Sequence, residues 1–137
     1  MNPFQNIFDK QKTYFNSDAT KTYEWRIDQL NRLEKMIKEN EADFQKAMGV
    51  DFKTSFAEQY FETSAPIATI EYAKSQLKSW MEPTPAPVPK FLAKSGHRAE
   101  VIREPYGVTL VISPSNGPLL LSIRPAVNAI SAGNPIV

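Results

Sequence analysis

The side chain in this sequence best suited to chemistry is an amide in a short loop between two apolar segments. The loop runs Ser113-Pro114-Ser115-Asn116-Gly117-Pro118, and Asn116 carries its only side-chain amide. A carboxamide N–H can donate a hydrogen bond to an oxygen that becomes negative during a reaction. Pro114 and Pro118 restrict the backbone, so the donor could be held without reorganisation. The amide could instead cap the helix that follows, and the residues alone slightly favour that cap.

Two strand-like segments and a helix are needed to position this loop. Before it, Val108–Ile112 is an unbroken apolar run, which is typical of a strand buried on both faces of a parallel sheet. After it, apolar residues recur at helical spacing from Leu119 to Ile130, and Gly133-Asn134-Pro135 ends that helix. A second strand begins at Ile136-Val137. This order predicts a βαβ unit that directs the N-terminal dipole and free N–H groups of its helix toward the loop, where a pyrophosphate or an oxyanion could bind.

The composition excludes several classes of function. The 137 residues include 16 basic and 15 acidic ones, so there is no basic surface for nucleic acid or for a membrane. No apolar run is long enough to span a membrane, and the N-terminus does not resemble a secretory signal. Without cysteine, and with His97 as the only histidine, no metal site is expected. The lack of cysteine also gives weak support to a cytoplasmic location.

The N-terminal half is predicted to be a layer of helices. Apolar residues recur at helical spacing over 3–15, 23–37 and 70–81. Ser17-Asp18 is the expected cap of the second helix, and Asn40 that of a short third helix ended by Gly49. Charged residues around the second helix, Arg26 among them, are expected to be solvated, with Glu34 and Lys38 paired one turn apart.

Capping and proline patterns define the later helices. Ser55 and Glu58 form a capping-box pattern, and Pro66 predicts either a kink or two helices meeting near 63–65. Glu82–Pro89 then holds four of the 11 prolines and predicts an extended connector. Beyond the connector, Phe91–Ala93 and Arg98–Arg103 flank a turn and are predicted to form a hairpin or two short strands.

Three motifs, taken in order, resemble a known superfamily. Glu104–Gly107, the loop at Pro114–Pro118 and Ala132–Pro135 are similar in order and gaps to the NAD(P)-dependent aldehyde dehydrogenases. That superfamily's pattern is Glu-Pro-x-Gly, then Pro-Trp-Asn-aromatic-Pro, then Ala-Gly-Asn before a strand. The upstream part resembles the class-3-like, fatty-aldehyde branch through three further matches: Arg26 with Gln29 and Leu30, Asp51–Lys53, and Trp80-Met81 with Pro83.

The resemblance implies roles for the loop. Asn116 matches the asparagine of the oxyanion hole, which steadies the tetrahedral thiohemiacetal formed when a cysteine thiolate attacks an aldehyde. The parent enzyme would oxidise the aldehyde to a carboxylate, with hydride passed to NAD or NADP. The side of the cofactor site that holds the nicotinamide would be lined by the backbone of Ile112, Ser113, Pro114 and Ser115.

The resemblance also predicts the organisation of the chain. The expected fold class is α/β, with an N-terminal helical layer, a Pro-rich connector and β-hairpin arm, and the start of an incomplete Rossmann-like βαβ parallel sheet. The expected divisions are 1–82, helices of the cofactor-binding domain; 83–104, connector and oligomerisation arm; and 105–137, the first βαβ segment. A homodimer is expected for the parent. Because a domain rarely stops inside a buried strand, we expect the chain to be the front portion of a longer protein.

Two departures from the family pattern leave alternatives open. Ser115 replaces the family's tryptophan and Gly117 its aromatic residue, which predicts a wider substrate tunnel, a less rigid loop or an altered activity. The family's catalytic cysteine and general-base glutamate have no counterpart here, so the isolated chain is predicted to be inactive. A sister-branch reductase of acyl-CoA or acyl phosphate, or a non-catalytic scaffold of the same fold, remains an alternative.

Overall fold

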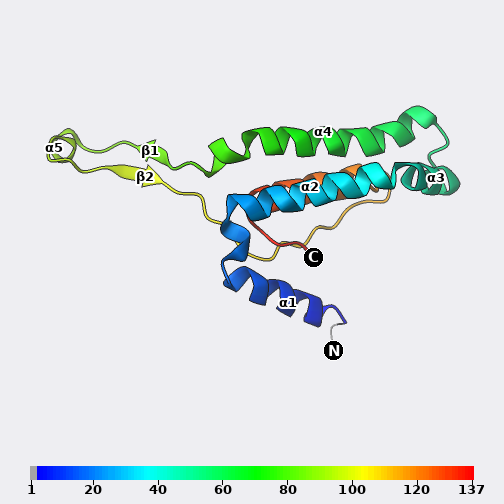
Figure 1. The fold of residues 1–137 in the computed structure, drawn as a ribbon, viewed down its shortest axis with the longest axis horizontal. Helices are drawn as coiled ribbons and strands as arrows, with labels where there is room; N and C mark the ends of the chain where they lie inside the picture. The colour runs from blue at the N-terminus through cyan, green and yellow to red at the C-terminus, as the bar shows by residue number, and fades with distance from the viewer. Residues whose placement is uncertain (1–2) are drawn as a thin grey trace.

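Three helices packed side by side form the body of the molecule, and a hairpin arm projects from it (Figure 1). The computed structural model describes residues 3–137, so residues 1–2 of the predicted first division lie outside it. The three helices are α2 (Tyr23–Glu39), α4 (Phe56–Met81) and α6 (Leu120–Ser131). A further helix, α1 (Gln5–Asn16), lies to one side and confirms the first predicted helix.

The core lies where α2, α4 and α6 meet. Leu30, Ile37, Ile70, Leu77 and Val127 are fully buried there. Each such side chain contributes about 1.5–3 kcal/mol when it leaves water. These residues belong to the apolar stripes predicted for the three helices. None of the helices in residues 3–137 has the length and apolar character needed to cross a membrane.

Neither predicted cap forms its side-chain hydrogen bond, although Asn40 does occupy the N-cap position of its helix. Asp18 adopts a left-handed conformation (φ 61°) and leads into the short 3₁₀ helix η1 (Ala19–Lys21). Thr22 then caps α2, since its Oγ1 accepts a hydrogen bond from the backbone N–H of Trp25 at 3.2 Å. Asn40 donates to the carbonyl of Met36 at 2.7 Å and does not cap α3 (Glu41–Asp51) with its side chain, and that helix includes Gly49.

Helix α4 is continuous through a proline. It begins after Ser55, whose side chain makes no capping bond, so the predicted capping box does not form. Pro66 lies inside the helix, and the alternative of two separate helices is wrong. Helix α6 likewise contains Pro125. Because proline has no N–H, the carbonyls of Glu62 and Leu121, one turn earlier, lack their usual helical donor.

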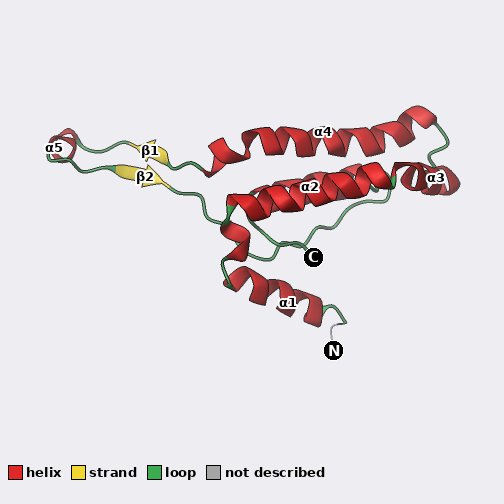
Figure 2. Ribbon diagram, in the orientation of Figure 1, coloured by secondary structure: helices red, strands yellow, loops and turns green. Residues whose placement is uncertain are grey.

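The arm is a hairpin with a helical tip (Figure 2). Strand β1 (Thr84–Ala86) pairs antiparallel with β2 (Ala99–Val101), and α5 (Lys90–Lys94) lies between them. The predicted hairpin is therefore present, but the predicted pairing of Phe91–Ala93 with Arg98–Arg103 is wrong. One strand comes from the proline-rich connector, where residues 84–86 are already extended, and Phe91–Ala93 are helical.

The predicted parallel pairing around the loop is present as an isolated bridge, but neither Val108–Ile112 nor Ile136-Val137 forms the predicted strand. Thr109 forms a parallel bridge with Ile136, and the backbone N–H of Val111 donates to the carbonyl of Val137 at 3.0 Å. The predicted burial is wrong for this chain, however: Leu110 is 65% exposed and Ile112 is 85% exposed. The fold is thus α/β, with the start of an incomplete parallel sheet beside a helical layer.

An ion-pair network between α2 and α4 predicts an acid-sensitive contribution to stability. Glu34 pairs with Lys38, as predicted, and also with Lys74. Hydrogen bonds from Lys38 and Lys74 lower the pKa of the Glu34 carboxyl below its ordinary value of 4.5. Stability from a depressed carboxyl pKa is present above that ordinary value and is lost as pH falls through the folded-state pKa.

We therefore expect Glu34→Gln to reduce the free energy of unfolding by about 1 kcal/mol at neutral pH. The deficit should shrink as pH falls below 4.5 in chemical denaturation at a series of pH values. Glu39→Gln is the control, since Glu39 pairs with Lys35 at 3.7 Å between two exposed side chains. An equal deficit at every pH would contradict the prediction.

Candidate functional site

The candidate loop lies between the parallel bridge and α6. It follows the carboxyl end of the segment 109–111, which is the edge at which open parallel sheets bind ligands. The side chain of Asn116 is exposed and makes no hydrogen bond within residues 3–137. The cap interpretation is therefore wrong in this structure, and the Asn116 amide is available to a ligand.

The N-terminus of α6 is capped instead by a carboxylate from α4. Glu62 Oε2 accepts hydrogen bonds from the backbone N–H groups of Leu120 at 2.9 Å and Leu119 at 3.2 Å. A carboxylate at a helix N-terminus also interacts favourably with the helix dipole. The prediction of free N–H groups at this helix end is consequently wrong for these two residues. A pyrophosphate would have to compete with Glu62 for them.

The Glu62 carboxylate is buried, and its charge is compensated. Its side chain is 4% exposed, and Lys53 Nζ lies 3.4 Å from its other oxygen, Oε1. A buried carboxylate is tolerated when an opposite charge and hydrogen-bond donors surround it. Lys53 thus completes a contact that joins the start of α4, the segment before it and the start of α6.

Gly117 fits closely into this arrangement. A Cβ at this position would lie 2.9 Å from both Cγ and Cδ1 of Leu121 and 3.4 Å from Glu62 Oε1. A larger side chain would require Leu121 to move. The small residue in place of the family's aromatic one therefore matches the close packing of the loop against α4 and α6.

A groove of about 500 Å³ opens beside Asn116 and Gly117. Its apolar wall comes from Phe61 on α4 and from Leu120 and Leu121 on α6. An exposed amide beside an apolar groove can bind a polar group whose attached chain is apolar.

The four residues before Asn116 have exposed backbone groups that are available for hydrogen bonds. Ile112, Ser113, Pro114 and Ser115 are exposed, and no hydrogen bond within residues 3–137 involves their backbone groups. Free peptide N–H and C=O groups suit a ligand that carries a carboxamide, such as a nicotinamide. The residues present therefore fit the cofactor that the resemblance implies.

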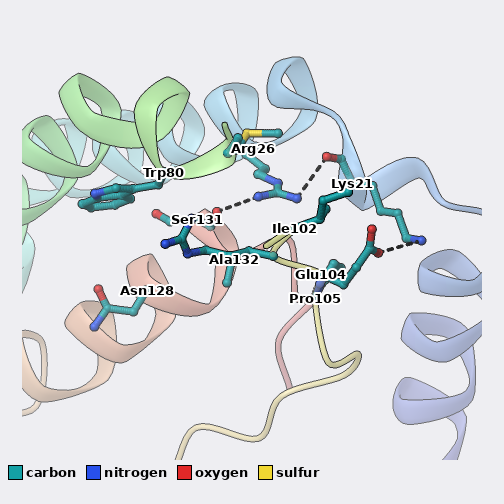
Figure 3. A pocket seen from close by; sticks show the side chains of 11 residues that line it. Lys21, Arg26, Trp80, Ile102, Glu104, Pro105, Asn128, Ser131 and Ala132 are labelled. Carbon is teal, nitrogen blue, oxygen red and sulfur yellow. Dashed lines mark hydrogen bonds and ion pairs between the residues drawn. The ribbon is translucent and has the colours of Figure 1, made fainter. Parts of the chain in front are cut away.

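A second cavity, of about 370 Å³, lies at the base of the arm, away from the predicted site residues (Figure 3). Arg26 points into this region from α2, with its guanidinium donating to the carbonyls of Ser131 and Lys21 at 3.0 Å and of Thr20 at 3.4 Å. Burial lowers the pKa of the Arg26 guanidinium, partly offset by Glu104. All three contacts are to the chain itself, so Arg26 has a structural role, and its predicted solvation is wrong.

The cavity wall is held by further contacts between distant segments. Lys21 Nζ lies 3.1 Å from Glu104 and 3.1 Å from Asp18, and hydrogen bonds with Asp18 and then Glu104 raise the pKa of the Lys21 ammonium. Trp80 lies at the end of the apolar stripe predicted over 70–81, but its side chain is 39% exposed and lines the cavity. No group of three or more potential metal ligands occurs among residues 3–137.

The motifs at Glu104–Gly107 and Ala132–Pro135, before the loop and after α6, are joined by a hydrogen bond. The backbone N–H of Gly107 donates to Oδ1 of the buried Asn134 at 2.9 Å. Gly133 (φ 85°) ends α6 as predicted, since the N–H groups of Gly133 and Asn134 close on the carbonyls of Ile130 and Ala129. These contacts fix the spacing of the two parallel segments beside the loop.

Sequence reasoning missed Glu62 and Arg26 although a signal was present. Glu62 lies one turn before Pro66 on the stripe that continues to Ile70, and Arg26 lies one turn before Leu30 on α2. A charged residue in register with an apolar stripe is a candidate for a buried, satisfied charge. Neither residue belongs to the loop in which the candidate chemistry was recognised.

Comparison with known proteins gives consistent matches over the whole length. A model of the aldehyde dehydrogenase family matches residues 4–137. Aldehyde dehydrogenase family 3 member I1, chloroplastic, of Arabidopsis thaliana is 38% identical over 132 residues, covering 96% of this chain and 24% of the relative. Aldehyde dehydrogenase, dimeric NADP-preferring, of Canis lupus familiaris is 33% identical over 138 residues, covering 100% of this chain and 30% of the relative.

A solved structure agrees as well. The substrate-bound state of Staphylococcus aureus AldH superposes with a TM-score of 0.93 at 33% identity, covering 99% of this chain and 30% of that one. The chain thus spans between 24% and 30% of the length of these three proteins.

Proposed function

Because this chain belongs to the aldehyde dehydrogenase family, on its class-3-like branch, we propose that it forms the N-terminal part of an enzyme that oxidises an aldehyde to a carboxylate with NAD or NADP. The observation that carries this proposal is Asn116, an exposed amide that makes no hydrogen bond within residues 3–137 and lies beside an apolar groove at the carboxyl edge of the parallel pair. The groove suits the apolar body of an aldehyde, and the amide suits its oxygen.

Asn116 would act on the oxygen of the aldehyde. A cysteine thiolate, supplied by another part of the parent, adds to the carbonyl carbon, and the electron pair of the C=O bond moves to oxygen. The amide N–H of Asn116 donates to that developing oxyanion and stabilises the tetrahedral thiohemiacetal. Collapse of this adduct re-forms the C=O bond as hydride leaves the carbon for the oxidised nicotinamide, and the resulting thioester would then be hydrolysed by water to the carboxylate and the free cysteine.

The backbone of the same loop would hold the cofactor. NAD or NADP, when bound there, would supply the acceptor for the hydride. The free backbone groups of Ile112, Ser113, Pro114 and Ser115 would hold its nicotinamide end. Among the relatives, the dog enzyme is named as NADP-preferring, which supports NADP alongside NAD.

We extend the proposal to the organisation of the parent. Residues 1–82 would belong to the cofactor-binding domain, 83–104 would form the connector and oligomerisation arm, and 105–137 would begin the Rossmann-like sheet. The projecting hairpin of β1 and β2 suits an arm that contacts a second subunit, and the dog relative is named as dimeric. A cytoplasmic homodimer is the proposed state.

The test is a comparison of the full-length protein with residues 1–137 alone. We expect the full-length protein to reduce NAD⁺ or NADP⁺ when an aldehyde is added, followed by the absorbance of the reduced nicotinamide. The isolated chain has no cysteine and should show no turnover. Turnover by the isolated chain, or none by the full-length protein with either cofactor across short and long aldehydes, would contradict the proposal.

The open alternatives give different results in the same system. Ser115 and Gly117, which replace two bulky residues of the family, favour a scaffold more than any other feature does. A scaffold would show no saturable change in NADH or NADPH fluorescence on titration. A sister-branch reductase would consume reduced cofactor when given an acyl-CoA or an acyl phosphate.

A further inference from the structure

We propose that Glu62 is a positioning residue for catalysis: its buried carboxylate fixes the end of the loop that carries Asn116. This inference rests on the proposed function, because it assigns Glu62 a role through Asn116 and not on the substrate. Nothing in the family motifs around the loop indicates Glu62, which lies on a different helix.

The loop has few other means of support. Leu119 occupies the N-cap position of α6, and its side chain cannot accept a hydrogen bond. Within residues 3–137, the carbonyls of Gly117 and Pro118 accept hydrogen bonds only from the start of α6. The donors are the backbone N–H of Leu121 and the hydroxyl of Ser122. Among residues 3–137, Glu62 is therefore the only side chain outside α6 that hydrogen-bonds this end of the loop.

The two carboxylate oxygens of Glu62 contact different partners. Oε2 accepts from the N–H groups of Leu119 and Leu120, just after the loop. Oε1 faces Lys53 Nζ at 3.4 Å and would lie 3.4 Å from a Cβ on Gly117, next to Asn116. The carboxylate thus both bonds the helix end and limits how closely the loop approaches α4.

We expect the Glu62 contact to affect the catalytic rate, because an oxyanion donor must be placed accurately to stabilise the developing charge. A donor displaced by about 1 Å can cost about 10²-fold in rate even when the change lies outside the chemistry. Without the Glu62 carboxylate, two N–H groups lose their acceptor and the loop end loses its tether to α4. Asn116 would remain present but would sample positions away from the oxyanion.

The test is a double-mutant cycle on kcat in the full-length enzyme. Glu62→Ala is expected to lower kcat by about 10- to 100-fold, with the KM for NAD(P) changed by less than about threefold. In the Asn116→Ala background the same substitution should change kcat by less than about twofold, since the donor it positions is absent. An equal fold-change in both backgrounds would overturn the proposal, because it would show that Glu62 acts independently of Asn116.

Two further variants keep the result interpretable. Glu62→Gln retains one acceptor oxygen for Leu119 and Leu120 and should keep kcat within about fivefold of the wild type. Loss of kcat as large as in Glu62→Ala would contradict a role for hydrogen bonding. Glu71→Ala, which removes an exposed acid from the same helix, is the matched control and should leave kcat unchanged.

Failure of the proposed function gives a different pattern. If Asn116→Ala alone leaves kcat unchanged in an assay limited by chemistry, then Asn116 is not the oxyanion donor. If Asn116→Ala lowers kcat and Glu62→Ala does not, the proposed function stands and the positioning role of Glu62 is overturned.

Discussion

Replacing Asn116 by alanine in the full-length enzyme is expected to lower kcat by about 10²–10³-fold, since this is the usual cost of losing one oxyanion donor. The KM for NAD(P) should change much less, because the side-chain amide is not the group that meets the cofactor. Steady-state kinetics, with a single-turnover measurement to establish that chemistry limits the rate, would separate the two effects.

The control is Asn128→Ala. This variant removes an exposed side-chain amide that lies on α6 and lines the cavity at the base of the arm, not the groove beside Asn116. It should leave kcat unchanged. The structure also removes one competing explanation in advance: Asn116 makes no capping bond to α6, so its replacement should not destabilise that helix. A fall in kcat accompanied by a comparable loss of stability would contradict the assigned role.

Replacing Arg26 by methionine is expected to reduce the free energy of unfolding by about 3 kcal/mol. The guanidinium donates to three backbone carbonyls, two of them at 3.0 Å, and buried hydrogen bonds that involve a charged group contribute about 1.5–3 kcal/mol each. Burial of the apolar methionine side chain offsets part of that sum. Methionine has a similar length but no donor, so Ser131 and Lys21 would lose their partners. Chemical denaturation would measure the loss.

The matched control is Arg32→Met on the same helix. Arg32 is 71% exposed and lies 3.9 Å from Asp28, so its pair should contribute less than about 1 kcal/mol. Equal losses from the two variants would show that the three carbonyl contacts do not stabilise the fold. Gly133→Ala should also lower the free energy of unfolding. Its Cβ would lie 2.8 Å from Arg26 Nη2 and would displace the guanidinium, and the backbone φ of 85° is unfavourable for alanine.

The elements that the sequence predicted well are those determined by neighbouring residues. The stop at Gly133-Asn134 requires only a glycine that tolerates positive φ, and the structure has it. The stripe through Leu30 and Ile37 repeats at helical spacing, and both side chains are fully buried.

The elements that it predicted poorly depend on distant partners. Glu62 meets Leu119 across 57 residues of sequence, and Arg26 meets Ser131 across 105, so neither pattern shows the contact. Trp80 lies on an apolar stripe yet remains partly exposed, because its side chain lines the open cavity at the base of the arm. Asn116 itself was recognised from its loop and its neighbours, and its catalytic role remains a prediction.

The two prolines inside helices have a consequence for the helix turns that adjoin the loop. Pro66 leaves the carbonyl of Glu62 without its usual donor, and Pro125 does the same for Leu121. These are the two turns that the loop touches, one on α4 and one on α6. Each turn lacks one backbone hydrogen bond, so its helix is held there by one bond fewer. The contacts of Glu62 and Leu121 with the loop therefore lie at turns whose backbone bonding is already incomplete, which makes these side-chain contacts the more important for the local structure.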